Sequence, residues 1–296
     1  MARCSLPSIL GRVGALTLCL IIPLRVGAAA GAGPLRPGSG SMSVNGTTLH
    51  YEIQGRGPAL VFLHAGIADS GMWDEQVRHF RTHFTVVRFD QRGYGASAPA
   101  TGPYAPVEDC DALLGALGID HATVIGLSNG GSFALDLALA HPGRVSRLVV
   151  VSSSPGWWRF STEFARRGAA LLAAGQQHGS AALVDGWMRD PMLQLASRRA
   201  SVARAMRRFL SRNTAGILSA PLFRPPSIPT PTVADIHVPT LIVVGDHDDP
   251  EIVARAPEMA SGIPGAETIV IAGADHMVNL ERPREFDRAL DRFLAR

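Results

Sequence analysis

The stretch Gly126-Leu127-Ser128-Asn129-Gly130-Gly131 decides the fold of this chain. It follows the apolar run Ala122–Leu127 and precedes the helical run Ser132–Ala140. The pattern G-x-S-x-G between a strand and a helix is typical of a nucleophile elbow, a sharp turn that exposes the serine Oγ. Side chains at positions 126 and 130 would clash in so tight a turn, and the helix that follows points its N–H groups at the site. The motif therefore predicts Ser128 as a nucleophile.

Short apolar runs alternate with helical stretches on both sides of this motif. The runs are rich in Val, Ile and Leu, as are strands buried on both faces of a sheet, and Asn45-Gly46 predicts a two-residue hairpin turn before the first of them. We therefore expect an α/β fold, with a mostly parallel central β-sheet flanked by helices. The predicted strands are Thr47–Ile53, Ala59–Leu63, Phe84–Phe89, Ala122–Leu127, Arg147–Val151, Thr240–Val244 and Thr268–Ile271, and the predicted helices lie near 71–81, 107–117, 129–140, 251–260 and 284–295.

One segment breaks this alternation. Residues 156–225 are rich in Ala, Arg and Leu without β-branched runs, which predicts several helices. The simplest architecture is one α/β core, formed by residues 42–155 and 238–296, with a helical cap or lid inserted at 156–237. The cap carries eleven arginines against four acids, a net charge of +7. These arginines either attract an anionic substrate or form the solvated faces of amphipathic helices.

Composition excludes several classes of protein. Of the 296 residues, 46% are hydrophobic and 18% are charged, which is too apolar for a disordered chain. Three cysteines cannot form a disulfide scaffold. All 28 basic residues are arginine, so lysine-based chemistry is excluded. The first 41 residues contribute four arginines and no acid to the net charge of +3, which leaves the remainder at −1 and gives no sign of nucleic-acid binding.

The N-terminus resembles a targeting segment. Basic residues precede the apolar stretch Val13–Leu24, small residues suited to signal cleavage follow it, and Gly31–Ser41 is rich in Gly and Pro. Residues 1–41 are thus predicted to be a signal-peptide-like leader with a linker, which implies a secreted or periplasmic protein with no stable membrane span once the leader is removed. Alternatively, Met42 is the true start and the protein is cytoplasmic.

A serine needs a base to become nucleophilic near neutral pH, and His276 is the best candidate. It lies in the loop Gly273-Ala274-Asp275-His276-Met277, just after the last predicted strand. Parallel sheets place their catalytic groups in loops beyond the carboxyl ends of the strands. The position of His276 therefore suits a general base.

An acid is needed to fix the tautomer of the base and to stabilise the imidazolium. The loop Gly245-Asp246-His247-Asp248-Asp249 follows another predicted strand and offers three carboxylates. We choose Asp248, with Asp246 and Asp249 as alternatives. The chain order is then Ser128, Asp248, His276.

The oxyanion formed during acyl transfer needs two backbone donors. One is expected to be the N–H of Asn129, directly after the nucleophile. The other is expected from the loop after the strand ending at Leu63, where Gly66 is the best candidate and Ala65 or Ile67 the alternatives. We expect His64 to orient this loop by hydrogen bonding.

From about residue 44 to the end, the chain resembles the α/β-hydrolase superfamily. The resemblance rests on several motifs in the right order, and it implies a Ser-Asp-His triad, a structural role for the segment 90–97 and a lid at about 156–237. Two departures are His-Ala-Gly where His-Gly-x is commoner, and Asn129 where Met, Trp or His is common. The motifs are Leu63-His64-Ala65-Gly66, Asp90-Gln91-Arg92-Gly93-Tyr94-Gly95-Ala96-Ser97, Gly126–Gly131, Gly245–Asp248 and Gly273–Leu280.

These residues predict an enzyme that hydrolyses a carboxylic ester or lactone of a small molecule through an acyl-serine intermediate. A serine nucleophile, rather than Asp or Cys, argues against haloalkane dehalogenases, epoxide hydrolases and dienelactone hydrolases. The same triad also supports C–C bond hydrolysis, cofactor-free perhydrolysis and acyl transfer, and a non-catalytic small-molecule receptor is a further alternative. No cofactor or metal is expected, because the sequence has neither Cys/His metal spacing nor a dinucleotide fingerprint. The sequence assigns no oligomeric state.

Overall fold

The computed structural model describes residues 35–228 and 231–296, so most of the predicted leader lies outside the described residues. An eight-stranded sheet forms the centre of the fold, in the order β1-β2-β4-β3-β5-β6-β7-β8. Strand β2 is antiparallel to both of its neighbours, and all other pairings are parallel. The predicted α/β fold is confirmed. The strands are β1 (Gly38–Val44), β2 (Thr47–Gly55), β3 (Ala59–Leu63), β4 (Thr85–Phe89), β5 (Ala122–Leu127), β6 (Val145–Val151), β7 (Thr240–Gly245) and β8 (Glu267–Ile271).

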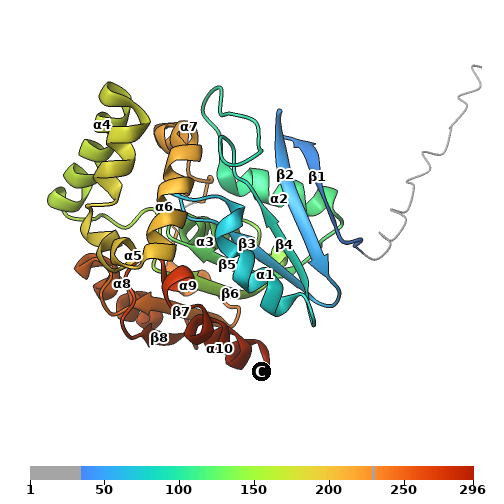
Figure 1. The fold of residues 1–296 in the computed structure, drawn as a ribbon. Helices are drawn as coiled ribbons and strands as arrows, with labels where there is room; N and C mark the ends of the chain where they lie inside the picture. The colour runs from blue at the N-terminus through green and yellow to red at the C-terminus, as the bar shows by residue number, and fades with distance from the viewer. Residues whose placement is uncertain (1–34, 229–230) are drawn as a thin grey trace, which may run out of the picture. The chain divides into compact units, whose positions relative to one another are not determined.

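Helices cover both faces of the sheet because its central strands are apolar on both sides. In β3, the side chains of Leu60 and Phe62 pack with one set of core residues, and Val61 and Leu63 pack with the other. The first set includes α1 and α10, and the second includes α2, α3 and α8 (Figure 1). These helices are α1 (Asp74–Phe80), α2 (Pro106–Ala116), α3 (Asn129–Ala140), α8 (Pro250–Gly262) and α10 (Pro283–Leu294), and the short α9 (Val278–Glu281) precedes α10.

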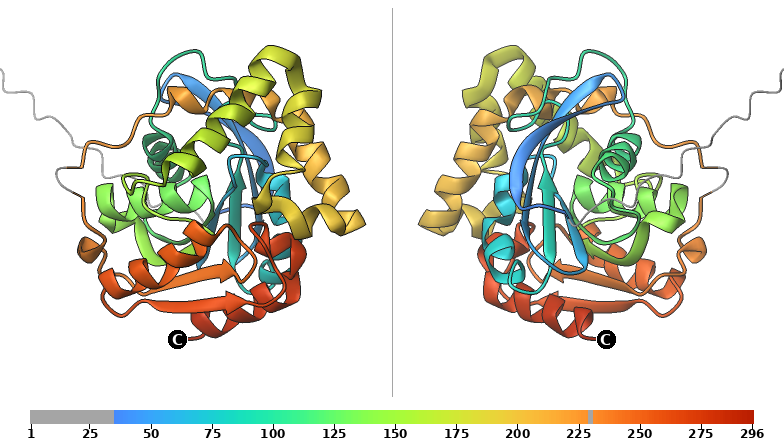
Figure 2. Two further views of the ribbon diagram at one scale, coloured as in Figure 1. Left: turned by 90° about the vertical axis from the view of Figure 1, so that its left-hand side faces the viewer. Right: turned by 90° about the vertical axis from the view of Figure 1, so that its right-hand side faces the viewer.

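Four further helices lie between β6 and β7, and they are drawn from yellow to light orange in Figures 1 and 2. Buried cap residues such as Leu183, Met206 and Leu210 join the apolar cluster of α1 and α10. Within the described parts of the chain, no helix is both long and apolar enough to cross a bilayer. The four helices are α4 (Thr162–Trp187), α5 (Gln194–Arg198), α6 (Ala200–Arg212) and α7 (Thr214–Leu218).

The hairpin of β1 and β2 corrects the predicted boundary of the linker. Its turn has positive φ at both Asn45 (45°) and Gly46 (70°), which is the geometry that an Asn-Gly pair favours. Strand β1 begins at Gly38, so the last four residues of the predicted linker belong to the sheet. Their small and polar side chains do not indicate a strand in the sequence, and the strand forms through backbone pairing with β2. A chain that starts at Met42 would lack half of β1.

Candidate active site

The elbow between β5 and α3 has the strained geometry that its sequence predicts. Ser128 has φ 56° and ψ −123°, and its carbonyl oxygen accepts from the hydroxyl of Ser153 at 2.7 Å. A Cβ at Gly126 would lie 2.1 Å from the carbonyl oxygen of Gly130, and one at Gly130 would lie 2.3 Å from that of Leu63. The predicted steric need for glycine at both positions is therefore confirmed, and it arises from close backbone approach.

His276 and Asp248 form a buried pair at the ends of β8 and β7. The His276 Nδ1 atom lies 3.0 and 3.2 Å from the two carboxylate oxygens of Asp248, and both side chains are at most 2% exposed. Burial opposes the imidazolium, but the charge and hydrogen bond of Asp248 outweigh it, so the pKa of His276 is raised above its ordinary 6.5. With the Nδ1–H donated to Asp248, Nε2 is left to accept a proton.

The other carboxylates near His276 have different partners. Asp246 accepts from the backbone N–H of Gly273 at 2.7 Å, which ties the loops after β7 and β8 together. Asp249 caps α8 by accepting from Glu251 N at 3.0 Å. Asp275 accepts from backbone N–H groups of the cap. Among the predicted acids, the geometry therefore favours Asp248 over Asp246 and Asp249.

Gly66 and Asn129, the predicted oxyanion donors, line the same cavity as Ser128. A Cβ at Gly66 would lie 2.3 Å from the Asn129 Nδ2 atom, so the two residues are in contact. The Tyr94 hydroxyl donates to the carbonyl oxygen of Gly66 at 2.9 Å and fixes that peptide. The N–H of Ala65 lies 3.3 Å from the sulfur of Met72, so this alternative donor already has a partner.

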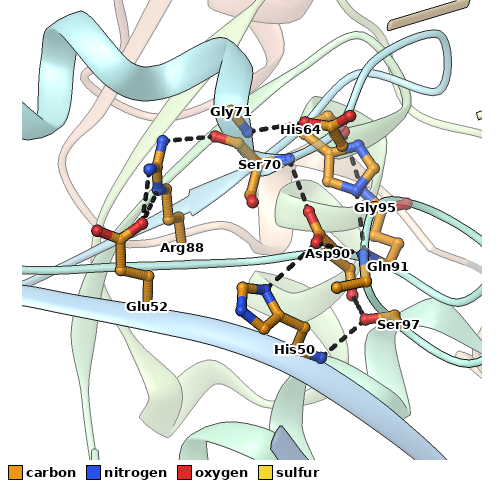
Figure 3. Close-up of polar contacts among 12 residues, drawn as sticks. His50, Glu52, His64, Ser70, Gly71, Arg88, Asp90, Gln91, Gly95 and Ser97 are labelled. Atoms are coloured by element: carbon orange, nitrogen blue, oxygen red, sulfur yellow. Dashed lines mark hydrogen bonds and ion pairs between the residues drawn. The ribbon is translucent and has the colours of Figure 1, made fainter. Parts of the chain in front are cut away.

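Contacts of His64 and Asp90 link the segment 90–97 to the residues that follow β3, as Figure 3 shows. We call residues 64–67, which are predicted to supply an oxyanion donor, the oxyanion loop. The Nδ1 atom of His64 contacts the carbonyl oxygen of Ala65 at 2.8 Å, and its Nε2 accepts from Gln91 N at 3.0 Å. Asp90 accepts from Ser70 N at 2.9 Å. Burial lowers the pKa of His64, which keeps it neutral. Both ring nitrogens are thus engaged in positioning the loop, as the sequence predicts.

One cavity of about 160 Å³ is lined by Ser128, His276, Gly66 and Asn129. The cap closes it with apolar side chains, among them Leu172 and Trp187. Phe209, another aromatic residue of the cap, is buried in the core cluster. A cavity of this size can hold a short acyl group.

Polar contacts join the cap to, or next to, the three loops that carry Asp248, Gly66 and His276. Arg167 of α4 pairs with Asp249 beside Asp248, and with Asp190 at 3.0 Å. Arg212 and Asn213 both donate to Asp69, just after the oxyanion loop, at 2.9 and 2.7 Å.

At the histidine loop, Asp275 accepts from the backbone N–H groups of Leu195 and Ala196 at 2.6 and 3.1 Å. Arg199 donates to the carbonyl oxygens of Gly273 and Glu281. Sequence reasoning missed these contacts because each joins residues about 80 to 140 positions apart without a motif.

Several arginines of the cap have structural partners. In the described chain, none of Arg166, Arg167, Arg198, Arg199, Arg204, Arg207, Arg208 and Arg212 lines the catalytic cavity. Arg166 pairs with Glu163 and Arg207 with Asp185 on the exposed surface. The geometry therefore favours a solvated and bridging role over capture of an anionic substrate. Among residues 35–228 and 231–296, no three His, Cys, Asp or Glu side chains are placed to hold a metal ion.

A model of the alpha/beta hydrolase family matches residues 60–289. The chain belongs to this family. The predicted superfamily is thereby confirmed, and with it the prediction of a hydrolase. The chain is 25% identical to 3-oxoadipate enol-lactonase 2 of Acinetobacter baylyi, over 86% of this chain and 96% of that protein. It is 29% identical to a putative carbamate hydrolase, RutD, of a Caulobacter strain, over 83% and 96% of the two chains.

The structure is also similar to that of an enol-lactonase from Burkholderia xenovorans, with a TM-score of 0.74 and 29% identity. The match covers 87% of this chain and all of that one.

Proposed function

We propose that this hydrolase cleaves carboxylic esters or lactones of small molecules through an acyl-serine intermediate. The observation that carries the proposal is the buried contact of His276 with Asp248 at 3.0 Å, in a cavity that also exposes Ser128. The similarity to enol-lactonases supports it, since opening a lactone is the intramolecular version of ester hydrolysis.

The proposed reaction begins with attack of the Ser128 oxygen on the substrate carbonyl, while His276 Nε2 takes the serine proton. The N–H groups of Gly66 and Asn129 stabilise the oxyanion of the tetrahedral intermediate. His276 then gives the proton to the leaving alkoxide, which leaves as an alcohol. Water attacks the acyl-serine, its proton passes to His276 and then to Ser128, and the carboxylic acid is released. Asp248 stabilises the imidazolium of His276 during both acylation and deacylation.

A fluorophosphonate probe tests this function on the full chain. We expect the wild type to be labelled and to hydrolyse short p-nitrophenyl esters, and Ser128→Ala to lose both the labelling and at least about 10³-fold in kcat. Ser261→Ala is the matched control, because Ser261 lies on the exposed surface of α8 and should leave both unchanged. A folded wild type that is neither labelled nor active would contradict the proposal and favour a receptor.

A further inference from the structure

A second cavity, of about 470 Å³, lies beside the catalytic one. The two share Asn129, which lines both. One face of α3 forms a wall of the larger cavity, with Asn129, Ser132, Phe133 and Asp136 at positions i, i+3, i+4 and i+7. A substrate bound at Ser128 can therefore extend along α3 into this space.

Asp136 is an unusual residue for such a wall. It is 7% exposed, and its carboxylate has no hydrogen bond or ion pair with the described residues. Other buried carboxylates of the chain have partners, as Asp109 has in Arg92 and Asp190 in Arg167. Burial raises the pKa of Asp136 to about 7. Without a partner in the described chain, this carboxylate is open to a cationic ligand that enters the cavity.

The rest of the wall is aromatic. Phe133 and Phe223 meet edge to face with ring centroids 5.6 Å apart, and Trp157 also lines the cavity. The other ionisable side chain among the described lining residues, Arg224, is exposed and donates to the carbonyl oxygens of Pro221 and Phe223. Aromatic faces around a carboxylate are the surroundings that bind organic ammonium groups.

We propose that this second cavity binds a cationic ammonium group of the substrate, with Asp136 as its counter-ion. The activity test of this inference rests on the proposed ester hydrolysis, and the binding test below does not. Ser128 and Asp136 are eight residues apart, roughly 12 Å along a helix axis. After allowing for the contact between cation and carboxylate, the substrate would carry its cation roughly six to eight bonds from the ester carbonyl.

Two series of methyl alkanoates test the proposal. One series ends in a trimethylammonium group and the other in a tert-butyl group of the same shape, so the pair differs only in charge. We expect the full-length wild type to favour the cationic ester by about tenfold or more in kcat/KM, with the largest ratio at six to eight bonds. Asp136→Asn should reduce this ratio to about one, and Asp120→Asn, which removes an exposed carboxylate elsewhere, should leave it unchanged.

The pH dependence of the ratio is a second measurement, because trimethylammonium keeps its charge at every pH. The ratio should rise as Asp136 ionises through about pH 7 in the wild type, and stay flat in Asp136→Asn. Apart from Arg224, the charged groups on elements packed against α3 are Glu108, Asp109 and Asp111 of α2, Arg144 beyond the end of α3 and Arg147 of β6. Glu108, Asp109, Asp111 and Arg144 are paired with partners of their own.

The outcomes separate this proposal from the proposed function. A wild type that hydrolyses both esters equally, or favours the neutral one, overturns the cation site but leaves ester hydrolysis intact. A preference for esters that end in a carboxylate would assign the cavity to Arg224 and also overturn it. If no ester is hydrolysed, binding of the two ligands to Ser128→Ala, followed by tryptophan fluorescence, decides: tighter binding of the cationic ligand supports the site, and equal binding overturns it.

Discussion

The core and the cap hold the same site by different means. In the core, the elbow at Ser128 depends on backbone hydrogen bonds and on glycines that leave no room for a side chain. The cap reaches the neighbouring loops through charged and polar side chains, such as Arg167 and Arg212. Steric constraints are insensitive to salt and pH. Ion pairs weaken as the salt concentration rises, and they are lost when a change of pH neutralises one partner. We therefore expect salt and pH to change the geometry of the core little, and to change the strength with which the cap is attached.

The largest effect is expected within the core. Asp248→Asn keeps the shape of the side chain but removes the charge that stabilises the imidazolium of His276, so kcat should fall by about 10⁴-fold. The matched control is Asp246→Asn, which keeps an oxygen able to accept from Gly273 and should cost less than about tenfold. Steady-state kinetics on p-nitrophenyl esters would measure both. Equal losses in the two variants would contradict the choice of Asp248.

A smaller effect is expected where the cap is attached. Arg167→Met leaves the carboxylates of Asp190 and Asp249 without their cation, and these side chains are only 2% and 5% exposed. We expect a loss of about 2–3 kcal/mol in the free energy of unfolding, since unpaired buried charges are costly. Denaturant titration would measure the loss.

The neighbouring arginine supplies the control. Arg166 pairs with Glu163, but both side chains are about two-thirds exposed. Arg166→Met should therefore leave the free energy of unfolding nearly unchanged, because solvent screens an exposed pair. If Arg167→Met proves as mild as Arg166→Met, the cap is held by its apolar residues and the contrast between core and cap fails.

The pH profile of activity tests the buried His276–Asp248 pair of the core. The raised pKa of His276 means that its Nε2 is a free base only above that pKa, so kcat/KM should fall as the pH drops, with an apparent pKa above 6.5. Because the pair with Asp248 is buried, this apparent pKa should move little between 0.05 and 0.5 M salt. An acid limb at or below 6.5 would show that Asp248 does not hold the imidazolium.

The core could be predicted from the sequence because its signals are local. Short apolar strands, glycines at 126 and 130, and loops just after strands each carry their own physical reason. The contact of His276 with Asp248, and the cavity shared by His276 and Ser128, could therefore be anticipated without coordinates. Strand β1 was harder, since its residues Gly38–Ser41 are too small and polar to mark a strand.

The cap could be predicted as helical, but its contacts could not. The pairing of Arg167 with Asp249 joins residues 82 positions apart, and no periodicity distinguishes this arginine from the exposed Arg166. Asp136 was missed for a related reason. Its only signal is a lone acid within the apolar helical run Phe133–Ala140, which gains meaning once a cavity is seen beside it.

The smallest effect is expected where core and cap meet, at Glu281. Burial and the neighbouring Asp275 raise the pKa of Glu281 to about 9, while Asp275 itself accepts from the cap backbone at Leu195. A carboxyl group whose folded pKa lies above its unfolded 4.5 binds its proton more tightly when folded. Its contribution to stability is therefore complete below about pH 4.5 and is lost as the pH rises toward 9.

Glu281→Gln removes this titration, because an amide stays neutral at every pH and can still accept from Asp275 N. We expect the variant to gain about 1–2 kcal/mol over the wild type between pH 6 and pH 9 in the free energy of unfolding. Glu285→Gln, on the exposed side of α10, should follow the wild type. If Glu281→Gln also follows the wild type across this range, Glu281 is ionised at neutral pH. The junction of core and cap would then tolerate an ionised Glu281, and the stability of the protein would not depend on the titration of this group.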